Sequence, residues 1–164
     1  MFRSRFLLAV LLVAAVAAPT VAHAAKAGSD ADLWATVNAC NPADNPGTVG
    51  VRVSMPGNGV AADKMFMRIQ LQFQGPKGAW RMIPASDSGW LPMGSAKQKR
   101  HQGGQTFSIQ PTAGKPATLR ALVNYEWRAP DGVIARHVKR LTTAGHVSSA
   151  GSDPVGFSQA TCTF

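Results

Sequence analysis

Apolar and polar residues alternate along several stretches of the chain, and this pattern constrains the fold more than any other feature of the sequence. Every second residue is apolar from Thr48 to Met55, and similar alternation recurs from Met65 to Gln74 and from Thr118 to Trp127. A two-residue period places one face of an extended chain in a core and the other in water. No stretch keeps the 3.6-residue period of a capped helix, so we expect strands and little or no helix.

Turn residues divide the chain into eight expected strands. Residues 74–78 and 129–132 combine Gly with Pro and each predict a hairpin between the strands on either side. The expected strands are 33–40, 48–55, 65–74, 79–83, 106–110, 118–127, 133–142 and 159–163. Short, regularly spaced strands predict an all-β fold, a single immunoglobulin-like antiparallel β-sandwich of about eight strands. Residues 84–105 are expected to form a long loop rich in Gly, Ser and Lys.

The chain has two cysteines, Cys40 and Cys162, which lie near opposite ends of the expected domain. In an oxidising compartment we expect them to form a disulfide that ties the first strand to the last. In the chain-entropy model, closing so long a loop stabilises a fold by about 4–5 kcal/mol. Eight strands could also close a barrel, but this bridge and the uneven strand lengths favour two sheets. Two isolated cysteines make a poor structural zinc site, which uses four ligands.

The N-terminal residues have the composition of a secretory signal peptide. Arg3 and Arg5 precede an uncharged apolar run over residues 6–18, and Ala22-His23-Ala24 offers small residues to a signal peptidase. The apolar run is too short to span a bilayer comfortably, and no second one follows. The sequence therefore predicts a signal peptide over residues 1–24 and no membrane span.

Cleavage after Ala24 would leave 140 residues, which suits one domain with a core. We expect residues 25–31 to form a flexible leader and residues 32–164 to form the sandwich. The expected location is outside the cell or at the cell envelope.

Basic residues suggest a contact with an anionic polymer. The formal net charge is +9, and most cations lie after Ala61. Four candidate binding residues lie in the expected loop, and two lie on the expected strand 133–142. They are Lys97, Lys99, Arg100, His101, Arg136 and Arg140. Polyanions within reach of an exported protein include cell-wall polymers, anionic lipid heads and extracellular nucleic acid. The alternatives are a solvated loop tip and, since residues 133–142 carry charges on both faces, an edge strand protected from self-pairing.

Motifs for catalysis and for metal binding have little support. Ser86-Asp87-Ser88-Gly89 is similar to the nucleophile motif of trypsin-like proteases, but residues 25–87 contain no histidine to act as its base. Glu126 is the only glutamate, which argues against a paired-carboxylate hydrolase. We therefore expect no enzyme, no bound metal and no cofactor.

One metal alternative stays open. Signal-peptide cleavage after Ala22 would make His23 the N-terminus, whose amine and ring could bind copper together with His101, His137 or His146. Such a site, or an enzyme site assembled from separated loops, would bring those histidines close to a carboxylate or to one another.

Three segments resemble a group of small secreted bacterial proteins: residues 32–40, 87–90 and 143–162. The layout is also similar to immunoglobulin-like and fibronectin type III-like domains. It differs from antibody domains because the cysteines are on the first and last strands. The resemblance implies an exported β-sandwich and no catalytic activity.

The sequence as a whole predicts an exported, non-catalytic binding or structural domain. Its expected partner is an anionic envelope polymer or another envelope protein, with no specific nucleic acid, and it is expected to be a monomer. The expected contact surface joins the basic loop to the polar faces of the long strands: Arg68, Gln70, Gln72, Arg120 and Asn124.

Overall fold

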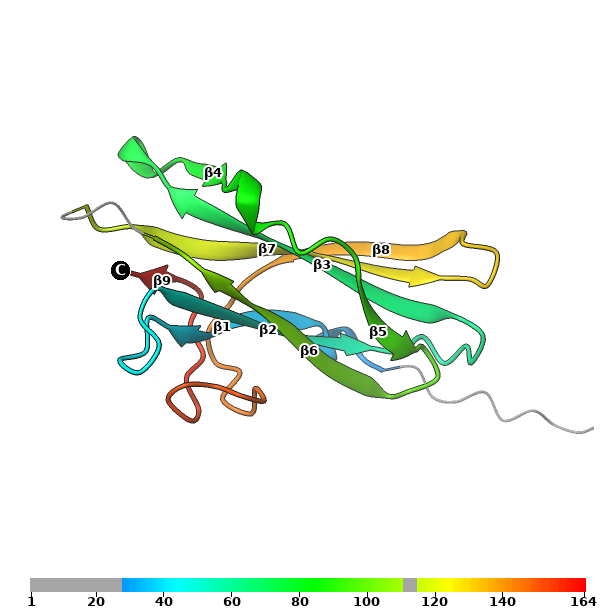
Figure 1. The fold of residues 1–164 in the computed structure, drawn as a ribbon. Coiled ribbons are helices and arrows are strands. Elements are labelled where there is room, and N and C mark those ends of the chain that lie inside the picture. Colours follow the sequence, from blue (N-terminus) through cyan, green and yellow to red (C-terminus); the bar gives the residue numbers. More distant parts are fainter. Residues whose placement is uncertain (1–27, 111–114) are drawn as a thin grey trace, which may run out of the picture.

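Two antiparallel β-sheets pack face to face in the computed structural model, which describes residues 28–110 and 115–164 (Figure 1). Sheet A has the order β1-β2-β6, and sheet B has the order β4-β3-β7-β8, with β5 also pairing with β3 and β9 with β7. The strands are β1 (Trp34–Cys40), β2 (Thr48–Pro56), β3 (Lys64–Gln74), β4 (Trp80–Met82), β5 (Leu91–Ser95), β6 (Arg100–Ser108), β7 (Thr118–Arg128), β8 (Ile134–Leu141) and β9 (Cys162–Thr163). The predicted all-β sandwich is confirmed.

Helix is limited to three-residue 3-10 turns in the described part of the chain. These are η1 (Asp30–Asp32), η2 (Pro76–Gly78) and η3 (Pro84–Ser86). No helix among the described residues is long and apolar enough to cross a membrane. The predicted signal peptide, residues 1–24, lies outside the described residues. Residues 28–31 belong to the predicted leader, and the Gly28 amide donates to the Gly57 carbonyl oxygen (3.0 Å).

The prediction of a loop over residues 84–105 is wrong, because β5 and most of β6 lie within it. β6 has no apolar alternation, yet it pairs with β2 along its whole length, from Arg100 opposite Pro56 to Ser108 opposite Thr48. Gly103 lies on its inner face, where a Cβ atom would come within 2.5 Å of the Met93 sulfur. A glycine therefore replaces the apolar residue that the pattern requires, since side chains from the other sheet already fill that space.

The core consists of the inward-facing residues of both sheets, as the alternation predicts. They include Val49, Val51, Val53, Met65, Ile69, Leu71, Val123, Tyr125 and Trp127, all at most 1% exposed. The Tyr125 hydroxyl donates to the Trp34 carbonyl oxygen (2.8 Å), and the Trp127 indole N–H donates to that of Pro56 (2.9 Å). The polar atoms of both large aromatic side chains are therefore satisfied within the core.

The disulfide between Cys40 and Cys162 is formed, as predicted, and it links β1 of sheet A to β9 of sheet B. The two cysteines lie 122 positions apart in the sequence. The bridge thus closes the sandwich at the end of the molecule where the C-terminus lies (Figure 1).

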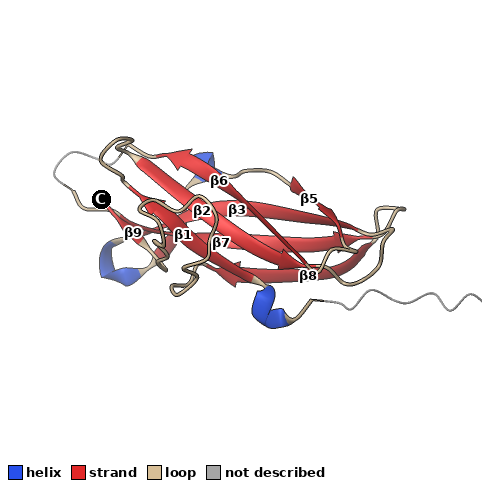
Figure 2. Ribbon diagram, turned by 90° about the horizontal axis from the view of Figure 1, so that it is seen from below, coloured by secondary structure: helices blue, strands red, loops and turns tan. Residues whose placement is uncertain are grey.

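Residues 143–160 cover the outer face of β1, as seen from below in Figure 2. The Asn38 side-chain amide donates to the Gly151 carbonyl oxygen (2.7 Å), and the Thr36 and Ser158 hydroxyls share a hydrogen bond (2.8 Å). Eight of the nine residues of β2, all except Arg52, are buried, and they lie on both faces of the strand, such as Thr48 and Val49. The alternation predicted one solvent-facing side for 48–55, and this covering segment is the reason that side is largely buried.

Candidate functional site

The described part of the sandwich has several strand edges, and the free edge of β6 is long and carries no charge over residues 102–108. The free edge of β1 is bridged to Gln159 and Asp153. β8, at the edge of sheet B as predicted, carries charges on both faces, and β4 has only three residues. β6 pairs only with β2 among the described strands, and residues 102–110 contain neither charge nor proline. Unpaired, uncharged edges are templates for pairing with another chain.

The register of β6 determines which groups face its free side. The Ile109 amide donates to the Gly47 carbonyl oxygen (2.7 Å), so odd-numbered residues direct their backbone groups toward β2. Gly104, Thr106 and Ser108 therefore direct their backbone N–H and C=O groups away from β2. Phe107 lies opposite the buried Val49, so its side chain points toward the interior.

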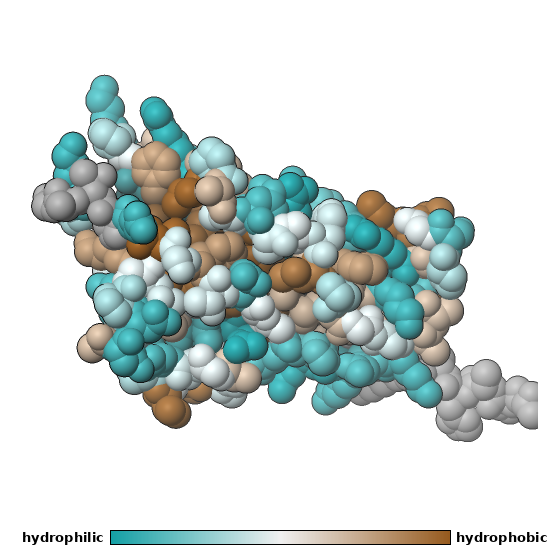
Figure 3. Space-filling model, viewed as in Figure 1, coloured by the Kyte–Doolittle hydropathy of each residue, from teal (hydrophilic) through white to brown (hydrophobic). Residues whose placement is uncertain are grey.

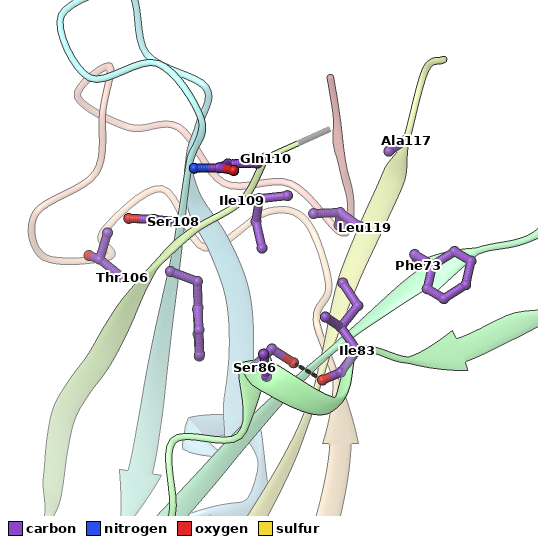
Figure 4. Close-up of a pocket in the computed structure, with 11 residues that line it drawn as sticks. Phe73, Ile83, Ser86, Thr106, Ser108, Ile109, Gln110, Ala117 and Leu119 are labelled. Atoms are coloured by element: carbon purple, nitrogen blue, oxygen red, sulfur yellow. Dashed lines mark hydrogen bonds between the residues drawn. The ribbon is translucent and has the colours of Figure 1, made fainter. Parts of the chain in front are cut away.

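A groove of about 520 Å³ lies beside this free edge, between β6 and the part of sheet B near β4 and η3 (Figure 4). We call it the β6 groove. Its lining residues are Phe73, Ile83, Ala85, Ser86, Thr106, Phe107, Ser108, Ile109, Gln110, Ala117 and Leu119. Figure 3 shows apolar surface gathered at the end of the molecule where β4 and the end of β6 lie. The groove combines an apolar lining with backbone groups that pair with no other described strand, although the Thr106 carbonyl oxygen accepts from the Gln105 side chain (3.2 Å).

The chemistry available in the β6 groove is limited. None of its lining residues is ionisable. The Ser86 hydroxyl is already engaged, since it donates to the Ile83 carbonyl oxygen (2.7 Å) and accepts from the Leu71 amide (2.8 Å). General acid–base chemistry requires a titratable group at the reacting atoms. The lining therefore suits an apolar ligand and offers no acid or base.

The Ser86-Asp87-Ser88-Gly89 motif tethers the chain to β3. The Ser88 hydroxyl accepts from the Ile69 amide (2.9 Å), and Asp87 accepts from the Arg68 guanidinium (2.8 Å from Nε). Hydrogen bonds from Arg68 and from the Gly89 amide lower the pKa of Asp87 to about 2. The motif therefore has a structural role, and none of these partners is the histidine that a protease-like nucleophile would need.

The candidate basic residues fall into two groups in the structure, two that form ion pairs and four that are exposed. Arg100 pairs with Asp32 (3.5 Å) and Arg136 pairs with Asp30 (2.7 Å), so both contact η1. Hydrogen bonding to Arg136 lowers the pKa of Asp30. Arg136 also lies over the Trp127 ring, 4.6 Å from its centroid, which closes that side of the core.

The other four candidate residues are exposed. Lys97 and Lys99 lie in the turn between β5 and β6, and Arg140 lies on β8. Neither Lys97, Lys99 nor Arg140 forms an ion pair with a described residue. The His101 ring shares a hydrogen bond with Gln98 (3.1 Å).

The three histidines of the copper alternative lie in different surroundings. His101 contacts Gln98, the His137 ring shares a hydrogen bond with Asn124 (3.2 Å), and His146 stacks on Trp34. No group of three or more His, Cys, Asp or Glu residues that could hold a metal occurs in residues 28–110 and 115–164. His137 is opposite Glu126 in the register, but that carboxylate accepts from Arg128 (2.7 Å). His23 lies outside the described residues.

The polar side chains on the outer face of sheet B form hydrogen bonds and stacking contacts with neighbouring residues. The Arg120 guanidinium donates to Gln72 (2.8 Å) and lies over the Trp80 ring. The Gln70 side chain donates to Asp87 (3.2 Å), the carboxylate that also accepts from Arg68. A ligand on this face would compete with these contacts.

Comparison with known proteins does not assign a family: no protein-family model matches the chain, and no curated protein matches it. The sequence predictions did not include the β6 groove. One signal for it exists in the sequence, the run without charge from Gln102 to Gln110 directly after the cluster of cations. Its other walls come from β3, η3 and β7. These elements are far apart in the sequence, and no local sequence pattern predicts that they meet.

Proposed function

We propose that this protein is an exported, non-catalytic binding domain that adds an extended segment of another envelope protein to the free edge of β6. The observation that carries the proposal is the unguarded edge of β6 beside an apolar groove. We also propose that this sandwich is related to immunoglobulin-like and fibronectin type III-like domains and to small secreted bacterial proteins. Strand addition is a recurrent mode of peptide recognition in which backbone hydrogen bonds give affinity and pockets for alternate side chains give specificity.

The backbone of the ligand would pair with the outward-directed groups of Gly104, Thr106 and Ser108. Its alternate side chains would enter the groove and contact Phe107 and Ile109. Each fully buried aliphatic side chain contributes roughly 1.5–3 kcal/mol. Two or three such side chains, with the new backbone hydrogen bonds, would offset the cost of ordering the segment.

The groove also defines the chemistry of the segment. A charged side chain placed against this lining would lose its hydration without gaining a partner, because no lining residue is ionisable. The segment should therefore be extended, free of proline, and apolar at every second position. Charged residues would be accepted only at positions that point away from the groove.

Binding of a labelled peptide tests this proposal. The probe is a fluorescein-labelled heptapeptide of alternating threonine and valine, titrated by fluorescence anisotropy. Ile109→Lys places a charge in the groove and should weaken binding at least about tenfold. Val133→Lys adds the same charge at a position that is 60% exposed, outside the groove, and should leave binding unchanged.

Two further controls sharpen the result. The same peptide with proline at its centre lacks a backbone donor and should bind more weakly. Thermal unfolding monitored by circular dichroism should show that I109K remains folded. Equal affinities of wild type and I109K, or no binding by wild type, would contradict the proposal.

A second candidate function is contact with an anionic envelope polymer through the turn between β5 and β6. It is supported by the exposure of Lys97 and Lys99, which form no ion pair with a described residue. Co-sedimentation with insoluble envelope material across a salt series separates the two functions. Polymer binding should weaken steeply with salt and fall when Lys97, Lys99 and Arg100 become Ser, whereas groove binding should be insensitive to salt.

A further inference from the structure

Arg52 occupies a position that a structural role does not explain. It lies near the middle of β2, on the outer face of sheet A, and is only partly exposed. Its Nε atom is buried and has no hydrogen-bond partner in the described part of the chain. The ion pairs of the described residues do not include it either. A guanidinium has only donors, so an arginine shielded from water normally pairs with an acceptor.

Glycines keep the space around this guanidinium open. A Cβ atom on Gly151 would lie 2.8 Å from an Arg52 terminal nitrogen, and one on Gly104 would lie 2.4 Å from the Val51 carbonyl oxygen and 3.4 Å from Arg52 Nε. Gly151 also has a φ of +65°, a conformation that favours glycine. Side chains at these positions would crowd the guanidinium.

The open space forms a trough of about 360 Å³, which we call the Arg52 trough. It lies between β1, β2 and β6 on one side and the covering segment on the other. Its lining residues are Asn38, Ala39, Gly50, Val51, Arg52, Gly104, Gln105, Thr106 and Gly151. Arg52 is the only charged residue among them, so the trough has one cation and no carboxylate.

The covering segment holds the trough in shape. Asn38 donates to the Gly151 carbonyl oxygen (2.7 Å), and the Ala150 amide donates to the Gln102 side chain (3.0 Å). These contacts join the covering segment to both β1 and β6, on either side of β2. A ligand would therefore meet a cavity whose walls are already ordered, which lowers the entropic cost of binding.

We propose that the Arg52 trough binds an oxyanion, the carboxylate or phosphate group of a small molecule or of a larger ligand. The planar guanidinium offers paired donors that match either group, and the anion would contact its terminal nitrogens, which are not among the buried unpaired atoms. The proposal does not depend on strand addition because it rests on Arg52, although Gly104 and Thr106 belong both to the trough and to the edge of β6.

A nuclear magnetic resonance titration tests this site. Sodium phosphate and sodium acetate are added separately to the purified protein, with sodium chloride keeping the ionic strength constant. The amide signals of Gly104 and Gly151 should shift and saturate with phosphate, acetate or both. A response to one anion alone identifies the oxyanion, and a response to both assigns the site to oxyanions in general.

Variants separate this site from general attraction to a basic surface. R52Q removes the cation and should weaken binding at least about tenfold. R52K keeps the charge but loses the paired donors and should bind less tightly than wild type. Arg81→Gln removes an exposed cation on β4, outside the trough, and should bind like wild type.

Folding of the variant provides a second readout. Without added anion, R52Q should unfold at the same temperature as wild type or higher, because it removes a charge that has no partner. Adding the anion should then raise the unfolding temperature of wild type and of R81Q but not of R52Q. Glycine shifts that fail to saturate, that chloride reproduces, or that persist in R52Q would overturn the proposal.

Discussion

His146 stacks on Trp34, with ring centroids 4.4 Å apart, and joins the covering segment to β1. Its ring also shares a hydrogen bond with the Thr143 hydroxyl (2.9 Å), and its backbone amide donates to Ser158 (2.7 Å). Burial lowers the pKa of His146 below its usual value of 6.5. The neutral ring is therefore the form that the folded protein favours.

Acid should weaken this contact. The unfolded chain binds a proton at His146 at a higher pH than the folded protein does, so the free energy of unfolding should fall as pH drops below 6.5. Asp87 has a pKa of about 2 against an ordinary 3.8, so its contribution is lost only in more acidic solution. Urea unfolding from pH 7 to pH 5 measures the histidine effect.

The control for this prediction is His146→Phe, which keeps an aromatic ring and removes the titration. Its stability should depend less on pH in that range than the stability of wild type. An unchanged pH dependence would show that another group is responsible.

At the level of the elements, the edge strands β6 of sheet A and β8 of sheet B differ in the charge along their free edges. β8 carries Arg136, His137, Lys139 and Arg140 within five positions, whereas residues 102–108 of β6 carry no charge. Charges on an edge strand oppose pairing with a second copy because pairing would bring like charges together and remove their water. One edge is therefore blocked, and the other is left available for a ligand.

Removing the charges of β8 should expose a second edge for pairing. The variant Lys139→Thr with Arg140→Thr keeps the Arg136–Asp30 ion pair. At the same protein concentration it should self-associate more strongly than wild type. Sedimentation velocity measures the effect. Lys97→Ser with Lys99→Ser lowers the net charge by the same amount away from any edge of β8 and should not self-associate further. Equal behaviour of both variants would assign the effect to net charge.

Alternation predicted the long strands that supply the core, turn residues predicted the hairpin partners β4 and β8, and both signals missed β5 and most of β6. β2, β3 and β7 were predictable because their inward residues supply the core. Most of β6 was not, since Gly103 stands where side chains of the other sheet fill the core. The burial of Thr36 and Asn38 was hidden as well, because hydrogen bonds from residues more than 100 positions away cause it. Both candidate sites depend on such distant segments.

At the scale of the whole molecule, the disulfide and the covering segment hold the two sheets in one unit. The Cys40–Cys162 bridge joins sheet A to sheet B, and residues 143–160 lead from β8 of sheet B across β1 of sheet A. The long separation of the cysteines means that the bridge restricts the unfolded chain strongly.

Replacing both cysteines by alanine should lower the free energy of unfolding by about 2–5 kcal/mol. Urea unfolding measures this change, and wild type in the presence of a reductant should show a similar loss. A loss below about 1 kcal/mol in both experiments would mean that the sheets stay together without the bridge.

Hydrogen exchange at β6 tests the central claim most directly. In the free protein, the amides of Thr106 and Ser108 should exchange fast, and those of Phe107 and Ile109 should exchange slowly because they face β2. The threonine–valine peptide should slow exchange at Thr106 and Ser108, and the proline-containing peptide should do so much less. Slowed exchange confined to other strands, or no change at Thr106 and Ser108 when the peptide is bound, would contradict strand addition to β6.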